Sequence, residues 1–339
     1  MTRFIRISNA DGKAWVLPTK GMRTALYLYQ PGGIKGKLLK KFLPLLWRFS
    51  LVRRLLHIEQ VSRPYPELDA RLRQAFELTG DYNIALFEGT PCVHQKATMQ
   101  VFQGSKIYGY VKLSDHPSVT ALFEKEKEIL DYLRAVGVEH VPTCLSLTEC
   151  EIDGKLFTVF IQDTNKGLNC RVLHDWSALT EEFLMQLEKR TSLVAPFSQT
   201  TLYDNIQAAY PVAPAFLQER FAALLSEYEG REIVCCLNHG DFTPWNMYIQ
   251  DGALEVFDWE YASFCNPVGL DRCHFRLQTG IFEKKLSAEQ LIERYVRTAE
   301  EKDLYRLYLL HICAHYLRRD PRCVESREMK IWMDILNQI

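Results

Sequence analysis

The segment CLNHGDFTPWNMYIQDGALEVFDWEYA, residues 236–262, constrains the fold of this chain more than any other stretch of its sequence. Its apolar runs flank Asp251-Gly252, a dipeptide that favours a tight hairpin turn. The segment therefore predicts a hairpin that begins at Asn246 and ends at Asp258. Because a hairpin brings its two ends together, these two side chains are expected to face one pocket.

Three oxygen-bearing side chains of this segment, Asp241, Asn246 and Asp258, have an informative spacing. A carboxylate and an amide oxygen are hard ligands suited to magnesium, which takes its other ligands from water and substrate phosphates. Asp241, in the loop before the hairpin, is placed to accept a proton or hydrogen bond from an attacking hydroxyl. Each residue alone is more often a turn or cap residue, but the combination favours a metal and phosphate site.

The rest of the chain divides into a strand-rich region and a helical region. After a first stretch that is hard to assign, with one short strand in KAWVLPT, three strand-forming runs begin at about residue 81. An amphipathic helix follows in SVTALFEKEKEILDYLRAVGV, and then come two more strands, TCLSLTEC and KLFTVFIQD. This order predicts a small sheet with one helix across it, and the residues after TNKGLN are mainly helical apart from the hairpin.

The motifs HGDFTPWN and FDWE resemble the catalytic and metal-binding motifs of the aminoglycoside phosphotransferase and choline kinase-like family. The resemblance covers about residues 81–320. It implies an α+β protein with a two-lobed protein-kinase-like fold, in which a small antiparallel sheet and one helix form the N-lobe. By the same resemblance residues 1–80 are an N-terminal extension, 81–165 the nucleotide-binding N-lobe, and 166–339 a mainly helical C-lobe that carries the catalytic hairpin and substrate site.

The resemblance also implies ATP and Mg²⁺ as cofactors and a small-molecule alcohol as substrate. Asp241 resembles the catalytic base, Asn246 a magnesium ligand and Asp258 the main magnesium ligand. Three further residues are expected to support the site. His239 is expected to orient the loop, and Glu260 to tune the metal site or the substrate side. Asp271 is expected to cap the next helix or to brace the loop.

A kinase of this kind needs a cation on a central strand to hold phosphates, and a helix acid to fix that cation. Lys112 ends the third strand and Glu126 lies on the following helix, where the register leaves Glu124 and Glu128 as alternatives. The loop EGTPCVHQK lacks a glycine-rich pattern, so backbone cradling of phosphates is not predicted there. The remaining nucleotide-site candidates, chosen by position, are Gly89, Gln162 and Asp163.

The formal net charge of −1 gives no indication of a nucleic-acid partner. Ten cysteines occur without a CxxC pair, and the first residues lack the apolar core of a signal peptide, so a cytoplasmic protein is expected. No apolar run reaches the roughly 20 residues that span a bilayer. The sequence leaves the oligomeric state open.

Residues 35–54 combine basic residues with apolar residues at helical spacing and contain no acid. One interpretation is a helix docked on the body with its basic face in water; another is a peripheral contact with the inner membrane surface, or a clamp for an anionic substrate. The basic residues of this segment are Lys35, Lys37, Lys40, Lys41, Arg48, Arg53 and Arg54.

The favoured function is ATP- and magnesium-dependent phosphoryl transfer to a hydroxyl of a sugar, an amino alcohol or a lipid-linked sugar. The atypical phosphate loop and the long N-terminal extension motivate an alternative, a catalytically weak nucleotide-binding scaffold. A protein kinase is a third interpretation. The DWE variant and the helical residues 170–235 favour a small acceptor over a protein.

Overall fold

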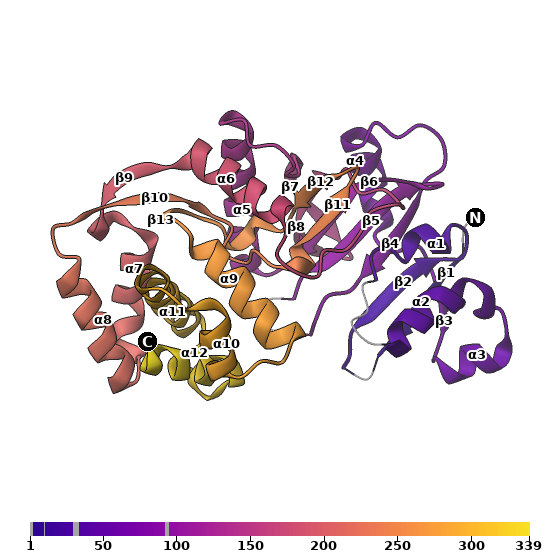
Figure 1. Cartoon of the computed structure of the whole chain (residues 1–339). Helices are drawn as coiled ribbons and strands as arrows, with labels where there is room; N and C mark the ends of the chain where they lie inside the picture. The colour runs from indigo at the N-terminus through magenta and orange to yellow at the C-terminus, as the bar shows by residue number, and fades with distance from the viewer. Residues whose placement is uncertain (1–2, 10, 30–33, 92–94) are drawn as a thin grey trace. The chain divides into compact units, whose positions relative to one another are not determined.

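The computed structural model describes residues 3–9, 11–29, 34–91 and 95–339 (Figure 1). The chain forms two compact units. The first unit comprises Met1–Arg134, His140–Arg171 and Gln250–Glu255. The second comprises Ala135–Glu139, Val172–Ile249 and Val256–Ile339.

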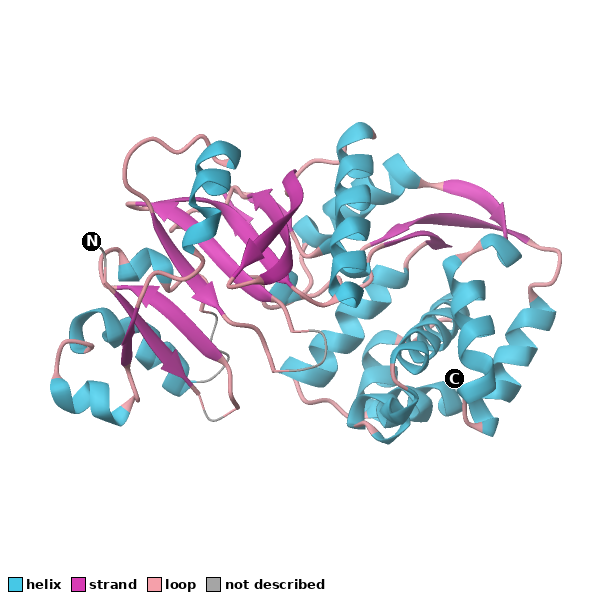
Figure 2. Ribbon diagram, turned by 180° about the vertical axis from the view of Figure 1, so that it is seen from behind, coloured by secondary structure: helices cyan, strands magenta, loops and turns pink. Residues whose placement is uncertain are grey.

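The first unit is built on an eight-stranded sheet with the order β3-β1-β2-β4-β5-β6-β8-β7, in which each neighbouring pair is antiparallel. Figure 2 shows these strands gathered side by side. The strands are β1 (Phe4–Ser8), β2 (Ala14–Pro18), β3 (Glu59–Val61), β4 (Asn83–Phe87), β5 (Ala97–Gln103), β6 (Lys106–Ser114), β7 (Cys144–Ile152) and β8 (Lys155–Asp163).

The five strands and one helix predicted after residue 81 are β4–β8 and α5 (Pro117–Ala135). The turn between β5 and β6 is Gly104-Ser105, where Gly104 has a φ of 59°. This left-handed conformation suits glycine, and it fixes the pairing of Gln103 with Lys106. Along α5 the apolar side chains of Phe123, Ile129 and Leu133 are fully buried, as their helical spacing predicts.

Residues 1–80 contain more structure than the single strand predicted from KAWVLPT. That strand is β2, and it pairs with both β1 and β4, so the sheet continues directly from residues 81–165 into the extension. Ile5 and Leu17 pack in one core with Phe102 and Ile107. The helices of this part are α1 (Met22–Ala25), α2 (Ile34–Leu46), α3 (Ser50–Leu55), the 3₁₀ turn η1 (Pro66–Leu68) and α4 (Asp69–Ala75).

The second unit is mainly helical, with a three-stranded sheet of order β13-β10-β9 and part of the hairpin β11-β12. Its core packs α7, α8, α9, α11 and α12 through apolar side chains that include Phe221, Leu277 and Trp332. The helices are α6 (Ala178–Thr191), α7 (Thr201–Ala209), α8 (Ala215–Glu227), α9 (Leu270–Gln278), α10 (Ala288–Tyr295), α11 (Ala299–Arg319) and α12 (Arg327–Gln338). The strands are β9 (Leu193–Pro196), β10 (Glu232–Asn238), β11 (Met247–Gln250), β12 (Ala253–Val256) and β13 (Ser263–Pro267).

The sequence pattern of residues 287–319 predicts one continuous helix, but the structure divides it into α10 and α11. Thr298 caps the start of α11 and exchanges hydrogen bonds with Glu301 in a capping box. Among the described residues, no helix combines the length and the apolar character needed to cross a bilayer.

Short helical turns link the elements of the second unit. They are η2 (Phe197–Gln199), η3 (Tyr210–Val212), η4 (Pro244–Asn246), η5 (Trp259–Tyr261), the π-helical η6 (Thr279–Glu283) and η7 (Pro321–Glu325).

Candidate functional site

In the first unit, Lys112 and Glu126 form a buried ion pair. Lys112 lies on β6 between Thr98 of β5 and Phe160 of β8, and Glu126 lies on the inner face of α5. The Lys112 Nζ is 2.8 Å from Glu126 Oε1 and 2.7 Å from Oε2, and the two residues are 6% and 0% exposed. Burying two charges costs free energy that mutual attraction and hydrogen bonds must offset, so such a pair requires a specific geometry.

This geometry settles which glutamate faces the strand. Glu124 and Glu128 are exposed on the outer side of α5, whereas Glu126 shares its buried face with Phe123 and Ile129. The structure therefore brings together Lys112 and Glu126, the two residues that the sequence selected as a phosphate-holding pair. Their role toward a nucleotide stays a prediction.

The other nucleotide-site candidates of this unit have local structural roles. Gly89 has a φ of 90°, and a Cβ there would lie 2.3 Å from the Lys96 carbonyl oxygen, so this tight backbone approach requires glycine. Asp163 Oδ1 accepts a hydrogen bond from the Thr143 backbone N–H at 2.6 Å, which ties β8 to the start of β7. Gln162 is buried, and its Oε1 has no hydrogen-bond partner among the described residues. Residues 92–94 of the predicted phosphate loop lie outside the described residues.

In the second unit, the loop after β10 is fixed by the imidazole of His239. Its Nδ1 accepts a hydrogen bond from the Asp241 backbone N–H at 3.2 Å, so the ring proton lies on Nε2 and is donated to the Phe257 carbonyl at 3.0 Å. Burial lowers the pKa of His239, which favours this neutral form. Trp259 packs on the ring with centroids 4.5 Å apart. His239 thus joins the loop that carries Asp241 to the end of the hairpin.

Asp271 braces the same loop from α9. Its carboxylate accepts hydrogen bonds from the backbone N–H groups of His239 and Gly240 at 2.7 and 3.1 Å. Burial raises the pKa of Asp271, and these two donors oppose that rise by favouring the ionised form. The sequence left two roles open for Asp271, a cap of the helix or a brace of the loop. Gly269 is the N-cap of α9, so Asp271 has the second role.

The side chain of Asp241 is held by two neighbours and remains 30% exposed. The Asn246 Nδ2 donates to Asp241 Oδ2 at 2.7 Å, and the His274 Nε2 is 3.1 Å from Oδ1. The Tyr308 hydroxyl is 3.1 Å from His274 Nδ1, and burial keeps the pKa of Tyr308 well above its usual value. A protonated Tyr308 donates to Nδ1, which leaves Nε2 of His274 as the donor to Asp241.

His274 and Tyr308 are residues that the sequence prediction missed. His274 lies on α9 three residues after Asp271, so both project on one face of the helix toward the loop. That spacing is a signal that sequence alone contains. Tyr308 is on α11, and its contact with α9 depends on the packing of two helices, which no short motif encodes.

The hairpin brings Asn246 next to the neighbour of Asp258, because the Phe257 N–H donates to the Asn246 carbonyl at 3.0 Å. Asp258 adopts the left-handed region with φ 68° and ψ 61°, a conformation that asparagine and aspartate tolerate better than other non-glycine residues. A carboxylate oxygen of Asp258 lies within 4.8 Å of one of Glu260, which is 5% exposed. Two carboxylates and one amide oxygen are a donor set that fits a hard divalent cation such as Mg²⁺.

Comparison with solved structures identifies the fold. A thermostable mutant of aminoglycoside phosphotransferase APH(4)-Ia, in a ternary complex with ADP and hygromycin B, superposes with a TM-score of 0.53 and 17% identity. The match covers 80% of this chain and 98% of that chain. The apo form of a thermostable mutant of the same enzyme gives a TM-score of 0.51 and 18% identity, over 80% of this chain and 97% of that one.

Sequence comparison adds nothing to this result, since no protein-family model matches the chain and no curated protein matches it. At identities below one fifth, the structural similarity concerns the arrangement of the chain. The predicted α+β class and the resemblance are confirmed at that level: the chain has the protein-kinase-like fold of the aminoglycoside phosphotransferases.

Proposed function

We propose that this protein is an ATP- and magnesium-dependent phosphotransferase that transfers the γ-phosphate of ATP to a hydroxyl of a small molecule. The observation that carries the proposal is the setting of Asp241, whose carboxylate is held by Asn246 and His274 and stays 30% exposed. The shared fold supports it, because APH(4)-Ia is seen with ADP and hygromycin B. The experiment that tests it is ATP turnover against a panel of aminoglycosides, amino alcohols, sugars and lipid-linked sugars.

Asp241 is the proposed catalytic base. A carboxylate offers about four lone-pair sites, and Asn246 and His274 occupy one on each oxygen. The remaining sites can accept the hydrogen bond of an acceptor hydroxyl and orient its oxygen for in-line attack. Most of the rate enhancement would come from this positioning and from electrostatic stabilisation.

Two sets of residues would bind the nucleotide, one through its phosphates and the other through its metal ion. Lys112, oriented by Glu126, would donate to phosphate oxygens, and residues 81–165 would form the nucleotide-binding lobe. Asn246, Asp258 and Glu260 would hold Mg²⁺, and residues 166–339 would provide the acceptor site. Bound Mg²⁺ would supply positive charge that neutralises the phosphates.

We expect Asp258→Ala to lose magnesium-dependent nucleotide binding, with an affinity about a hundredfold lower or more, since changes even to the residues behind metal ligands cost about tenfold to a hundredfold. Fluorescence titration of a labelled nucleotide, with magnesium and then with EDTA, measures the effect. Asp258→Asn removes the charge while retaining a residue type that tolerates the left-handed backbone, so it separates charge from strain.

Asp251→Ala is the matched control, because Asp251 also has a positive φ, of 51°, but lies exposed in the hairpin turn. Its nucleotide binding should equal that of the unchanged protein. Equal magnesium-dependent binding by Asp258→Ala and Asp251→Ala would contradict the metal assignment.

We expect His274→Ala to lower kcat by about tenfold to a hundredfold with the KM for ATP unchanged, because a hydrogen bond to a charged group is lost. His274→Gln keeps an N–H donor and should restore part of kcat. Tyr308→Phe removes only the donor to His274 Nδ1 and should have a smaller effect in the same direction. Steady-state kinetics measure all three; a rise in KM with kcat intact would show that His274 does not act on Asp241.

The catalytically weak scaffold remains a second candidate function, because the loop at residues 88–96 lacks a glycine-rich pattern. ATP turnover separates the two functions: a scaffold binds nucleotide but phosphorylates no member of the alcohol panel. A protein substrate in the same panel tests the protein-kinase alternative.

A further inference from the structure

The helices α2 and α3 of the first unit, together with the residues between them, carry a concentration of exposed apolar side chains. The exposed fractions are 60% for Leu45, 60% for Phe49, 77% for Leu51 and 73% for Leu55, and Leu38, Phe42 and Leu46 are each at least 40% exposed. The other exposed large hydrophobic residues of the described chain lie between Leu145 and Tyr316, and among them Val194 and Val234 face each other across β9 and β10. A clustered apolar surface of this kind marks an interaction site more often than scattered residues do.

The helix α2, which carries part of this cluster, is packed on the rest of the first unit. Leu43 of α2 is 2% exposed and packs in the core that contains Ile5 and Leu17. The Lys40 Nζ donates to the Tyr29 carbonyl at 2.8 Å and so fastens the helix to the body. The helix therefore has a docked apolar side and a second apolar side that faces outward.

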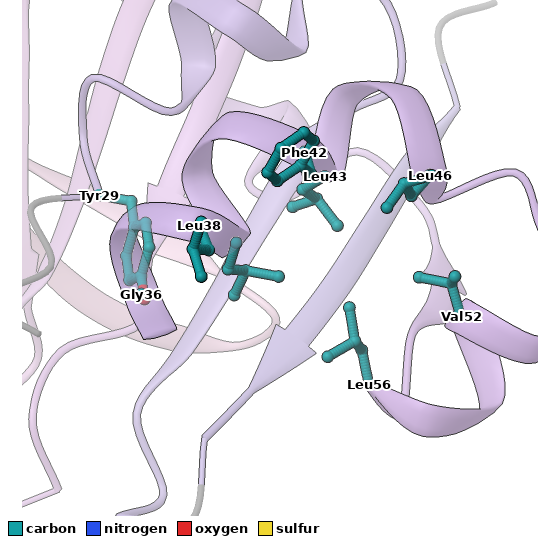
Figure 3. A pocket seen from close by; sticks show the side chains of 9 residues that line it. Tyr29, Gly36, Leu38, Phe42, Leu43, Leu46, Val52 and Leu56 are labelled. Carbon is teal, nitrogen blue, oxygen red and sulfur yellow. The ribbon is translucent and has the colours of Figure 1, made fainter. Parts of the chain in front are cut away.

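Between α2 and the end of α3 lies a groove of about 470 Å³, and none of the described residues that line it is charged. Figure 3 shows Phe42, Leu43 and Leu46 of α2 on one side of this space, and Val52 and Leu56 on the other. Its walls are mainly aliphatic and aromatic, with the Tyr29 hydroxyl as a polar side-chain group among the described lining residues, and this composition suits an apolar chain better than a hydrophilic ligand.

Positive charge surrounds these apolar side chains. Lys37, Lys41, Arg48 and Arg54 are exposed, and none forms an ion pair with another described residue. No acidic residue occurs from Ile34 to Ile58. An apolar face bordered by unpaired cations is the composition of elements that lie in the interface of an anionic bilayer.

We propose that α2 and α3 dock this protein on the surface of an anionic phospholipid bilayer, with the exposed leucines and phenylalanines entering the interface and the basic residues contacting headgroups. A second copy of the chain is a poorer occupant, because a two-fold interface would place the same cations opposite one another. Nucleic acid is a poorer occupant as well, since the protruding side chains are apolar. The docking surface is independent of the proposed phosphotransfer.

Vesicle co-sedimentation tests the proposal with the full chain. Deleting residues 1–60 is unsuitable, because these residues supply β1, β2 and most of β3 to the sheet. We expect the protein to pellet with vesicles of equimolar phosphatidylcholine and phosphatidylglycerol, and to stay in solution with phosphatidylcholine alone. Binding should weaken as salt is raised.

Two triple variants separate the charge from the apolar contribution. The charge variant Lys37→Gln, Lys41→Gln, Arg48→Gln should bind the anionic vesicles about a hundredfold more weakly. The apolar variant, formed by three changes to serine at exposed positions, should lose about tenfold or more. Its changes are Leu45→Ser, Phe49→Ser and Leu51→Ser.

The matched control combines Leu156→Ser, Met185→Ser and Lys155→Gln, which change exposed residues elsewhere and should leave vesicle binding unchanged. Circular dichroism checks that each variant is folded. Equal binding to both vesicle types, or wild-type binding by the charge and apolar variants, overturns the proposal. A concentration-dependent dimer that the apolar variant abolishes, without vesicle binding, would assign the surface to a second copy instead.

Discussion

Asp241→Asn is expected to lower the rate of phosphoryl transfer by about a thousandfold, since a positioned general base contributes of that order. Asparagine has nearly the same shape as aspartate, but its amide does not take up the proton of the substrate hydroxyl. Its Nδ2 group is also a hydrogen-bond donor at a position where the carboxylate has an acceptor oxygen. Nucleotide affinity should stay within a factor of about two, because the change carries no net loss of metal ligands. ADP release with the best acceptor from the alcohol panel gives the rate, and a labelled nucleotide gives the affinity.

The structure explains why this variant should remain folded. The Asp241 side chain is 30% exposed, so the carboxylate can be replaced without leaving an uncompensated buried charge. Its backbone N–H still donates to His239 Nδ1, and Asp271 still braces the loop. Asp251→Asn, in the exposed turn of the neighbouring hairpin, is the control for any general effect of losing an acid. Normal turnover by Asp241→Asn would remove Asp241 from the mechanism.

Local sequence predicted the part of the candidate site that short-range geometry determines. Asn246 and Asp258 are joined by a hairpin whose turn is Asp251-Gly252, so their proximity follows from turn chemistry and strand length. Glu126 follows from helical periodicity, because the buried face of α5 contains Phe123 and Ile129 and excludes Glu124 and Glu128.

Contacts between distant segments could not be predicted in this way. β1 pairs with β3 across more than fifty residues, Phe4 opposite Val61, and β3 is only three residues long. Such a strand has no periodicity to detect, and its pairing depends on the tertiary fold. Tyr308 reaches His274 for the same reason, through the packing of α11 on α9. The β1–β3 pairing and the contact of Tyr308 with His274 were therefore found only in the structure.

The Lys112–Glu126 pair allows stability and function to be separated. Lys112→Met alone leaves Glu126, which is 0% exposed, without its counter-charge, and should reduce the free energy of unfolding by about 3–5 kcal/mol. Glu126→Leu alone should have a similar cost. The double variant replaces the buried pair by apolar side chains of similar volume, and should recover to within about 1 kcal/mol of the unchanged protein. Urea denaturation of each protein measures these differences.

The exposed pair Lys127–Asp131 on the same helix is the matched control, and breaking it should cost about 0.5 kcal/mol or less. Nucleotide affinity then decides the role of the buried pair. If Lys112 holds phosphates, the double variant is stable but binds ATP far more weakly, because no cation remains on β6 at that position. A stable double variant that binds ATP normally would show that the pair only fixes α5 to the sheet. A single variant as stable as the unchanged protein would show that solvent reaches the pair, which contradicts its burial.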